Sequence, residues 1–196
     1  NTWEKVFEYA SMPVHGTLHH LQRHAALARE MAAAEVLRGS RARAAGNLSE
    51  AEAAAGRARE LERIAAVCSH VPAHAPRDFH EALQAYWFVH LGVITELNTW
   101  DSFNPGRLDQ HLCPFYEKAL REAEQAAAGA SDDPGSATTA GGAAAREQAR
   151  EQARERCREL LQCFWIKFNN QPAPPKVGVT AAESGTYTDF ANINLG

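Results

Sequence analysis

Apolar residues recur at three- and four-residue spacings along most of the chain, which is the period of an α-helix. Two short apolar runs near the end have the length and composition of strands instead. The pattern predicts helices over residues 1–10, 18–37, 49–70, 79–97, 114–128 and 144–168, and strands over residues 177–180 and 191–195. The fold class expected for this segment is therefore mainly α, with one or two short strands.

The connections are predicted from prolines, glycines and polar residues. Ser11-Met12-Pro13 is expected to end the first helix, and residues 39–47 to form a linker. Residues 71–76 contain two prolines and are predicted to be extended, because each proline disfavours helix in the residue before it. Residues 129–143 are rich in alanine, glycine and serine, so we predict a flexible insert there.

The buried faces follow from the same spacing. Residues 49–52 (SEAE) have the form of a capping box, so Ser49 is expected to start a helix. The stripes predicted to be buried comprise Leu21, Ala25, Ala28, Met31 and Ala32 in one helix, Leu61, Ile64, Ala65 and Cys68 in the next, and Leu160, Leu161, Phe164, Trp165 and Phe168 in the last.

The stretch at 79–97 differs, because its apolar residues cover every side of the helix. Such a helix must be buried all round. Asp78 is predicted to cap it, with Glu81 three residues on as the second half of an acidic capping box. His90, Gly92 and Thr95 interrupt the run, so we interpret it as a core helix and not a membrane span.

Composition excludes several classes of function. The net charge is −4 with no basic cluster, which argues against binding to nucleic acid or to an anionic membrane. The four cysteines have no CxxC or framework spacing and are expected to be reduced thiols, which indicates a cytoplasmic protein. His20 and His24 share a helix face, but no third or fourth ligand can be named, so no metal site is predicted.

A polar and aromatic segment follows the apolar helix. Glu96, Asp101 and Asp109 surround Arg107 in sequence, and a turn at Pro105-Gly106 would hold the guanidinium in place. These charges could perform acid–base chemistry or form a buried structural network. We favour the structural interpretation, because no substrate pocket is indicated.

Two blocks of sequence resemble the glycyl radical enzymes, the superfamily of pyruvate formate-lyase. ITELNTWDSF with PGRLDQHL, and the block at 164–196, are most similar to the choline trimethylamine-lyase subgroup and its relative isethionate sulfite-lyase. The resemblance implies an α/β barrel of two antiparallel five-stranded halves sheathed by helices. Residues 1–196 would be part of one such domain, and we expect the chain to be a piece of a longer polypeptide.

The resemblance also implies a mechanism. In this family a glycyl radical, installed by a radical S-adenosylmethionine activase, activates a cysteine, whose thiyl radical abstracts hydrogen from a small substrate. Neither the GCVE-type cysteine motif nor the RVxGY-type glycine motif occurs here, so this segment has no catalytic residue of its own and is expected to be inactive alone. The expected reaction of the whole enzyme is cleavage of choline to trimethylamine and acetaldehyde. Isethionate sulfite-lyase or another glycyl radical lyase or dehydratase is the alternative, and a non-catalytic helical module or gene remnant is the alternative from another class.

Two residues carry over to the substrate pocket. Phe190 matches an aromatic position that lines the cavity in the family, and an aromatic face suits a quaternary ammonium. Asn104 matches a position where related dehydratases place a small polar residue against the substrate. The expected partners are a small molecule, the activase and a second copy in a homodimer, in the cytoplasm or in a bacterial microcompartment.

Overall fold

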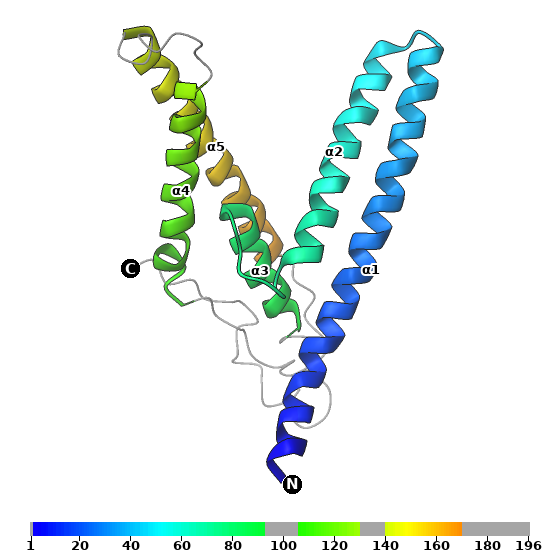
Figure 1. The fold of residues 1–196 in the computed structure, drawn as a ribbon, viewed down its shortest axis with the longest axis vertical. Coiled ribbons are helices and arrows are strands. Elements are labelled where there is room, and N and C mark those ends of the chain that lie inside the picture. The colour runs from blue at the N-terminus through cyan, green and yellow to red at the C-terminus, as the bar shows by residue number, and fades with distance from the viewer. Residues whose placement is uncertain (1, 93–105, 130–139, 170–196) are drawn as a thin grey trace. The chain divides into compact units, whose positions relative to one another are not determined.

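The computed structural model describes residues 2–92, 106–129 and 140–169, and every regular element within these ranges is a helix. The fold is therefore mainly α, as predicted; residues 177–180 and 191–195, where strands are expected, lie outside the described residues. The chain divides into two compact units, residues 1–75 and 76–196. The helices are α1 (Thr2–Ala44), α2 (Leu48–His70), α3 (Phe79–Gly92), α4 (Leu108–Gly129) and α5 (Ala140–Asn169) (Figure 1).

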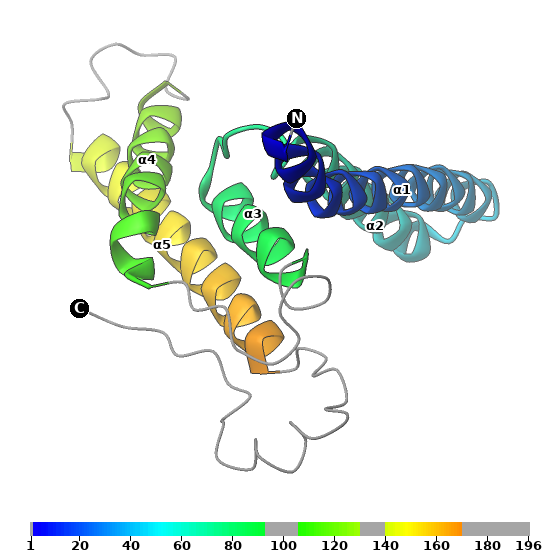
Figure 2. The same ribbon diagram turned by 90° about the horizontal axis from the view of Figure 1, so that it is seen from below.

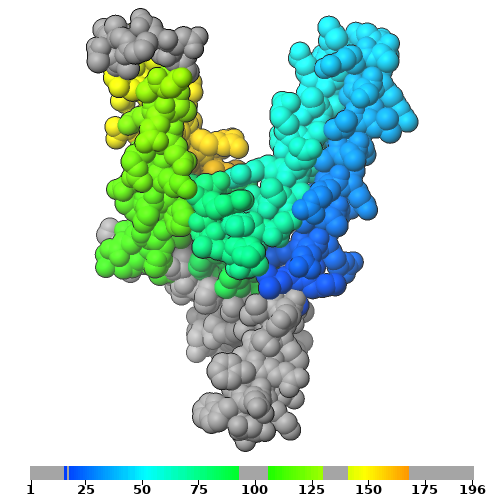
Figure 3. All heavy atoms as spheres, viewed as in Figure 1, coloured from blue at the N-terminus to red at the C-terminus, as the bar shows by residue number. Residues whose placement is uncertain are grey.

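The first unit is a hairpin in which the C-terminal part of α1 packs side by side with α2, while the N-terminal part of α1 extends beyond α2 (Figures 1 and 3). The buried positions recur at alternating spacings of three and four residues, which is the pattern of a coiled coil. They are mostly alanines, so the two backbones can approach closely. The buried residues with this spacing are Leu21, Ala25, Ala28, Ala32 and Ala42 on α1 and Ala51, Ala54, Ala58, Leu61 and Ala65 on α2. Val67 near the end of α2 is buried as well.

Gly39 lies at a close approach of the two helices in this seam. A Cβ atom at Gly39 would be 3.3 Å from the Cβ of Ala54 and 3.4 Å from the carbonyl oxygen of Ala51. Contacts this short leave almost no room for a larger side chain at either position. The linker predicted over residues 39–47 was therefore wrong for residues 39–44, which belong to α1, because Gly39 serves helix packing instead of chain reversal.

The turn itself is short and is built around Gly46. Gly46 has a φ of 78°, its N–H donates to the carbonyl of Arg43, and the N–H of Asn47 donates to that of Ala42. This is a Schellman ending, which needs a residue with positive φ. Asn47 then caps α2, since its side-chain oxygen accepts from the N–H of Glu50 at 3.2 Å. The cap predicted at Ser49 was thus two residues too late.

Other boundaries also differ from the sequence prediction. Helix α1 continues through Pro13, where we expected a break. A proline costs a helix about 3 kcal/mol, and the hydrogen bonds of a 43-residue helix on both sides can offset that loss. Residues 71–74 form a turn closed by the His74 N–H and the His70 carbonyl, because proline restricts the residue before it and leaves those after it free to turn.

Two residues of the stripes predicted for α1 and α2 are exposed. Met31 is 43% exposed and Ile64 is 42% exposed, although both are apolar. The buried seam between α1 and α2 is narrow, since it consists of positions that alternate at spacings of three and four and are mostly alanines. Apolar residues at its edges therefore stay in contact with water.

The second unit contains α3, α4 and α5. Helices α4 and α5 lie side by side, and α3 contacts both (Figure 2). Helix α4 begins at Leu108, six residues before the predicted start, and includes Pro114. Leu108 and Leu112 are buried in that first part. The prediction started this helix at Pro114, whereas the helix includes the turn before Pro114, in which these two leucines are buried.

Ion pairs support the exposed side of α5 and join it to α4. Arg150 of α5 lies 3.1 Å from Glu124 of α4, and Arg154 pairs with Glu151 at 2.8 Å within α5. Phe164 is buried, whereas Trp165 is 43% exposed. The arginine- and glutamate-rich half of α5 is thus a solvated face, as predicted, and only part of the apolar stripe is buried.

The predicted insert at 129–143 falls between α4 and α5. Gly129 is the last residue of α4, and α5 begins at Ala140, so residues 140–143 are helical. The remaining insert residues lie outside the described part of the chain. No helix among the described residues has both the length and the apolar character needed to cross a membrane.

Candidate functional site

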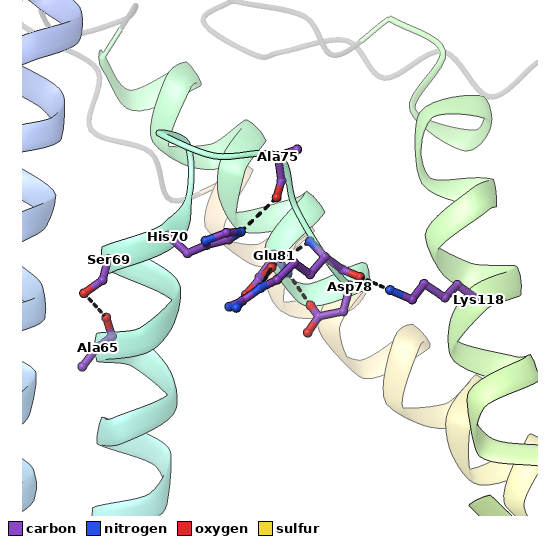
Figure 4. Close-up of polar contacts among 8 residues, drawn as sticks. Ala65, Ser69, His70, Ala75, Asp78, Glu81 and Lys118 are labelled. Atoms are coloured by element: carbon purple, nitrogen blue, oxygen red, sulfur yellow. Dashed lines mark hydrogen bonds and ion pairs between the residues drawn. The ribbon is translucent and has the colours of Figure 1, made fainter. Parts of the chain in front are cut away.

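The densest group of polar contacts lies at the start of α3. Asp78 caps the helix as predicted, since its Oδ1 accepts from the N–H of Glu81 at 2.8 Å (Figure 4). The Glu81 carboxylate turns back and accepts from the N–H of Arg77 at 2.7 Å, one residue earlier than the cap residue of a standard capping box. The capping box is therefore shifted by one residue, but its two side chains still accept hydrogen bonds from backbone N–H groups at the start of the helix.

Glu81 is also paired with the side chain of Arg77. The Arg77 Nε lies 3.0 Å from Glu81 Oε2, and Arg77 Nη2 lies 2.5 Å from Glu81 Oε1. The two side chains thus form a bidentate guanidinium–carboxylate pair. The Glu81 side chain is fully buried, whereas that of Arg77 is 57% exposed. A buried carboxylate is costly unless it is paired, so Arg77 is what allows Glu81 to lie inside the unit.

The ammonium group of Lys118 connects this site to α4. Lys118 of α4 donates from Nζ to the carbonyl oxygen of Arg77 at 2.7 Å (Figure 4). The backbone of Arg77 is thus held by Glu81 at its N–H and by Lys118 at its carbonyl. We call Arg77, Asp78, Glu81 and Lys118 the α3 anchor. Its arrangement fixes the entry of the chain into α3 and against α4.

The α3 anchor is suited to structure and not to acid–base catalysis. The hydrogen bonds from Arg77 lower the pKa of Glu81, although burial opposes that shift. A general base near neutral pH needs a raised carboxylate pKa and access to its substrate. Glu81 has neither, because its oxygens are occupied by Arg77 and its side chain is closed to solvent.

This lowered pKa predicts acid sensitivity at α3. A carboxylate with a depressed folded-state pKa stabilises the fold above its ordinary pKa of 4.5, and that stability is lost as the pH falls through the folded value. We expect the helical circular dichroism signal to fall below pH 4.5 in the wild-type chain. Glu81→Gln should remove part of this dependence, whereas Glu117→Gln on the exposed side of α4 should not. Identical acid titrations for the wild type and Glu81→Gln would contradict this role.

An aromatic cluster lies further along α3. Tyr86 and Trp87 each stack on His90, with ring centroids 5.9 and 5.5 Å away, and Phe164 of α5 meets Tyr86 edge to face at 5.9 Å. His90 is fully buried. Burial raises the pKa of Tyr86 above its ordinary value, so this phenol stays protonated. The cluster fills the contact between α3 and α5, in accordance with the predicted core helix.

The polar segment predicted from sequence is described only in part. Arg107 and Asp109 are both exposed, and Asp109 lies in the first turn of α4, where a carboxylate suits the helix dipole. Glu96 and Asp101 lie outside the described residues. For the two residues that are described, the structure does not support a buried network. The predicted pocket residues, Asn104 and Phe190, also lie outside the described residues and stay predictions.

The cysteines and histidines do not gather into a site within the described ranges. All four cysteines are free thiols; Cys157 is buried, and burial followed by the charge of Asp78 raises its pKa, which makes it a poor nucleophile. The rings of His20 and His24 lie 4.3 Å apart, and His24 Nδ1 is 2.9 Å from the His20 carbonyl oxygen. No group of three or more potential metal ligands occurs in the part of the chain described by the structure.

Sequence reasoning found two of the four anchor residues. Asp78 and Glu81 were identified by the capping pattern, whereas Arg77 was missed, although it precedes Glu81 by four residues and could have been noticed from that spacing. Lys118 is 41 residues away from Arg77 in sequence. No local signal marks such a long-range contact.

The chain belongs to the pyruvate formate lyase-like family. The family profile matches residues 4–130 and 147–196, which includes the α3 anchor and omits most of the predicted insert. The expected membership in the glycyl radical enzymes is therefore confirmed at the level of the family.

Individual relatives show which proteins of this family the chain is similar to. The chain is 50% identical over 164 residues to trans-4-hydroxy-L-proline dehydratase of Clostridioides difficile, a match that covers 83% of this chain and 17% of that protein. It is 43% identical over 81 residues to isethionate sulfite-lyase of Nitratidesulfovibrio vulgaris, covering 41% of this chain and 10% of that protein. The chain thus spans less than a fifth of these relatives. The search of solved structures found no match.

Proposed function

We propose that the protein containing this chain is a glycyl radical dehydratase that removes water from a small hydroxylated substrate of the trans-4-hydroxy-L-proline type. The observation that supports this proposal is the 50% identity to trans-4-hydroxy-L-proline dehydratase over 83% of the chain. The matches to isethionate sulfite-lyases are shorter and less similar, which makes sulfite release the second candidate. Choline cleavage, expected from the sequence blocks, is the third.

In such an enzyme this chain would have a structural role and would not contain the residues that carry out the reaction. It has neither the cysteine motif nor the glycine motif of the family, so its residues do not fit the glycyl radical and we assign no step of the reaction to them. The radical would be installed elsewhere in the polypeptide by an activase. The chain by itself is expected to be inactive.

The test is a comparison of substrates with the complete protein. It would be activated anaerobically and given trans-4-hydroxy-L-proline, isethionate and choline at equal concentrations, with the radical quantified by electron paramagnetic resonance. We expect loss of water from hydroxyproline, with no turnover by an unactivated preparation. Release of sulfite from isethionate, or of trimethylamine from choline, without reaction of hydroxyproline would overturn the proposal in favour of the corresponding lyase.

Phe190 and Asn104 are our proposed contacts to the substrate. The nitrogen of a proline ring is positively charged at neutral pH, as is that of choline, so the aromatic face of Phe190 would attract either one. Asn104 would offer an amide to a polar group of the substrate. Isethionate is an anion, for which an aromatic face gives no such attraction.

Replacing Phe190 with leucine should lower kcat/KM for a substrate with a positively charged nitrogen, hydroxyproline or choline, about tenfold, since a cation–π contact contributes about 1.4 kcal/mol within its usual range. Phe190→Tyr keeps the aromatic face and should stay close to the wild type. The radical content should be the same in all three proteins. Unchanged kinetics in Phe190→Leu at equal radical content would remove this residue from the pocket.

A further inference from the structure

We draw no further inference here: the strongest candidate, the exposed apolar side chains of Leu27, Met31 and Ile64 on the α1–α2 hairpin, carries no proposal because nothing in the described part of the chain shows what covers them.

Discussion

Replacing Ala54 with leucine should destabilise the α1–α2 hairpin by about 3 kcal/mol, at the upper end of the range for overpacked cores. The Ala54 side chain has no exposed surface, and the position that a Cβ would take at Gly39 is only 3.3 Å away. Three more heavy atoms could be accommodated only by separating the two backbones. That separation would open the neighbouring alanine contacts as well, so the effect cannot stay local.

Thermal unfolding followed by circular dichroism measures this effect, and Ala53 offers a matched control. Ala53 is exposed and adjacent in sequence, and leucine is a good helix former, so Ala53→Leu should leave the melting temperature nearly unchanged. Equal melting temperatures for Ala54→Leu and Ala53→Leu would show that the seam can accommodate larger side chains.

Replacing Arg77 with alanine should loosen the start of α3 more than removal of a surface arginine does. The substitution leaves the carboxylate of Glu81 buried and without its guanidinium partner, and such groups are costly. We expect amide hydrogen exchange in the first turns of α3 to accelerate on the order of tenfold. Adding Glu81→Gln to Arg77→Ala should recover part of the protection, because a neutral amide tolerates burial better than a charge.

Arg121→Ala is the control for this experiment. Arg121 and its partner Glu117 are 3.7 Å apart and both are 60% exposed, so that pair should contribute little. Faster exchange spread evenly over α3, α4 and α5 in Arg77→Ala would indicate general unfolding instead of loss of the anchor. No recovery in the double variant would argue that the guanidinium matters for packing and not for charge.

The sequence predicts this fold best where a residue interacts with residues close to it in sequence. Asp78 caps α3 because an aspartate at that position satisfies backbone groups within one turn, and this logic needs only four residues of sequence. Phe79, Leu83 and Phe88 are buried in α3, but Val89 is 42% exposed, so the burial predicted for every side of this helix is seen only in part among the described residues. Gly39 shows the opposite case, since nothing near it in sequence distinguishes a chain-reversing glycine from one that lies against Ala54.

The candidate site was harder to predict because it too depends on contacts between residues that are far apart in sequence. The pairing of Arg77 with Lys118 depends on how α4 packs beside α3, and that packing is decided by the buried leucines of α4. The pattern assigned charge pairing to Arg107 and missed Arg77. Both arginines are exposed and both have carboxylates nearby in sequence; they differ because Glu81, the partner of Arg77, is buried, whereas Asp109 is exposed.

The alanine seam between α1 and α2 also bears on the order in which the protein folds. A hairpin of adjacent helices with a three-residue turn brings together residues that are close in sequence, so little chain entropy is lost before its contacts form. Proteins dominated by such local contacts fold in microseconds to milliseconds, whereas barrels with distant strand pairs are far slower. The hairpin can therefore be complete while the ribosome is still adding α3 to α5, and it would present a finished surface to the later parts of the chain.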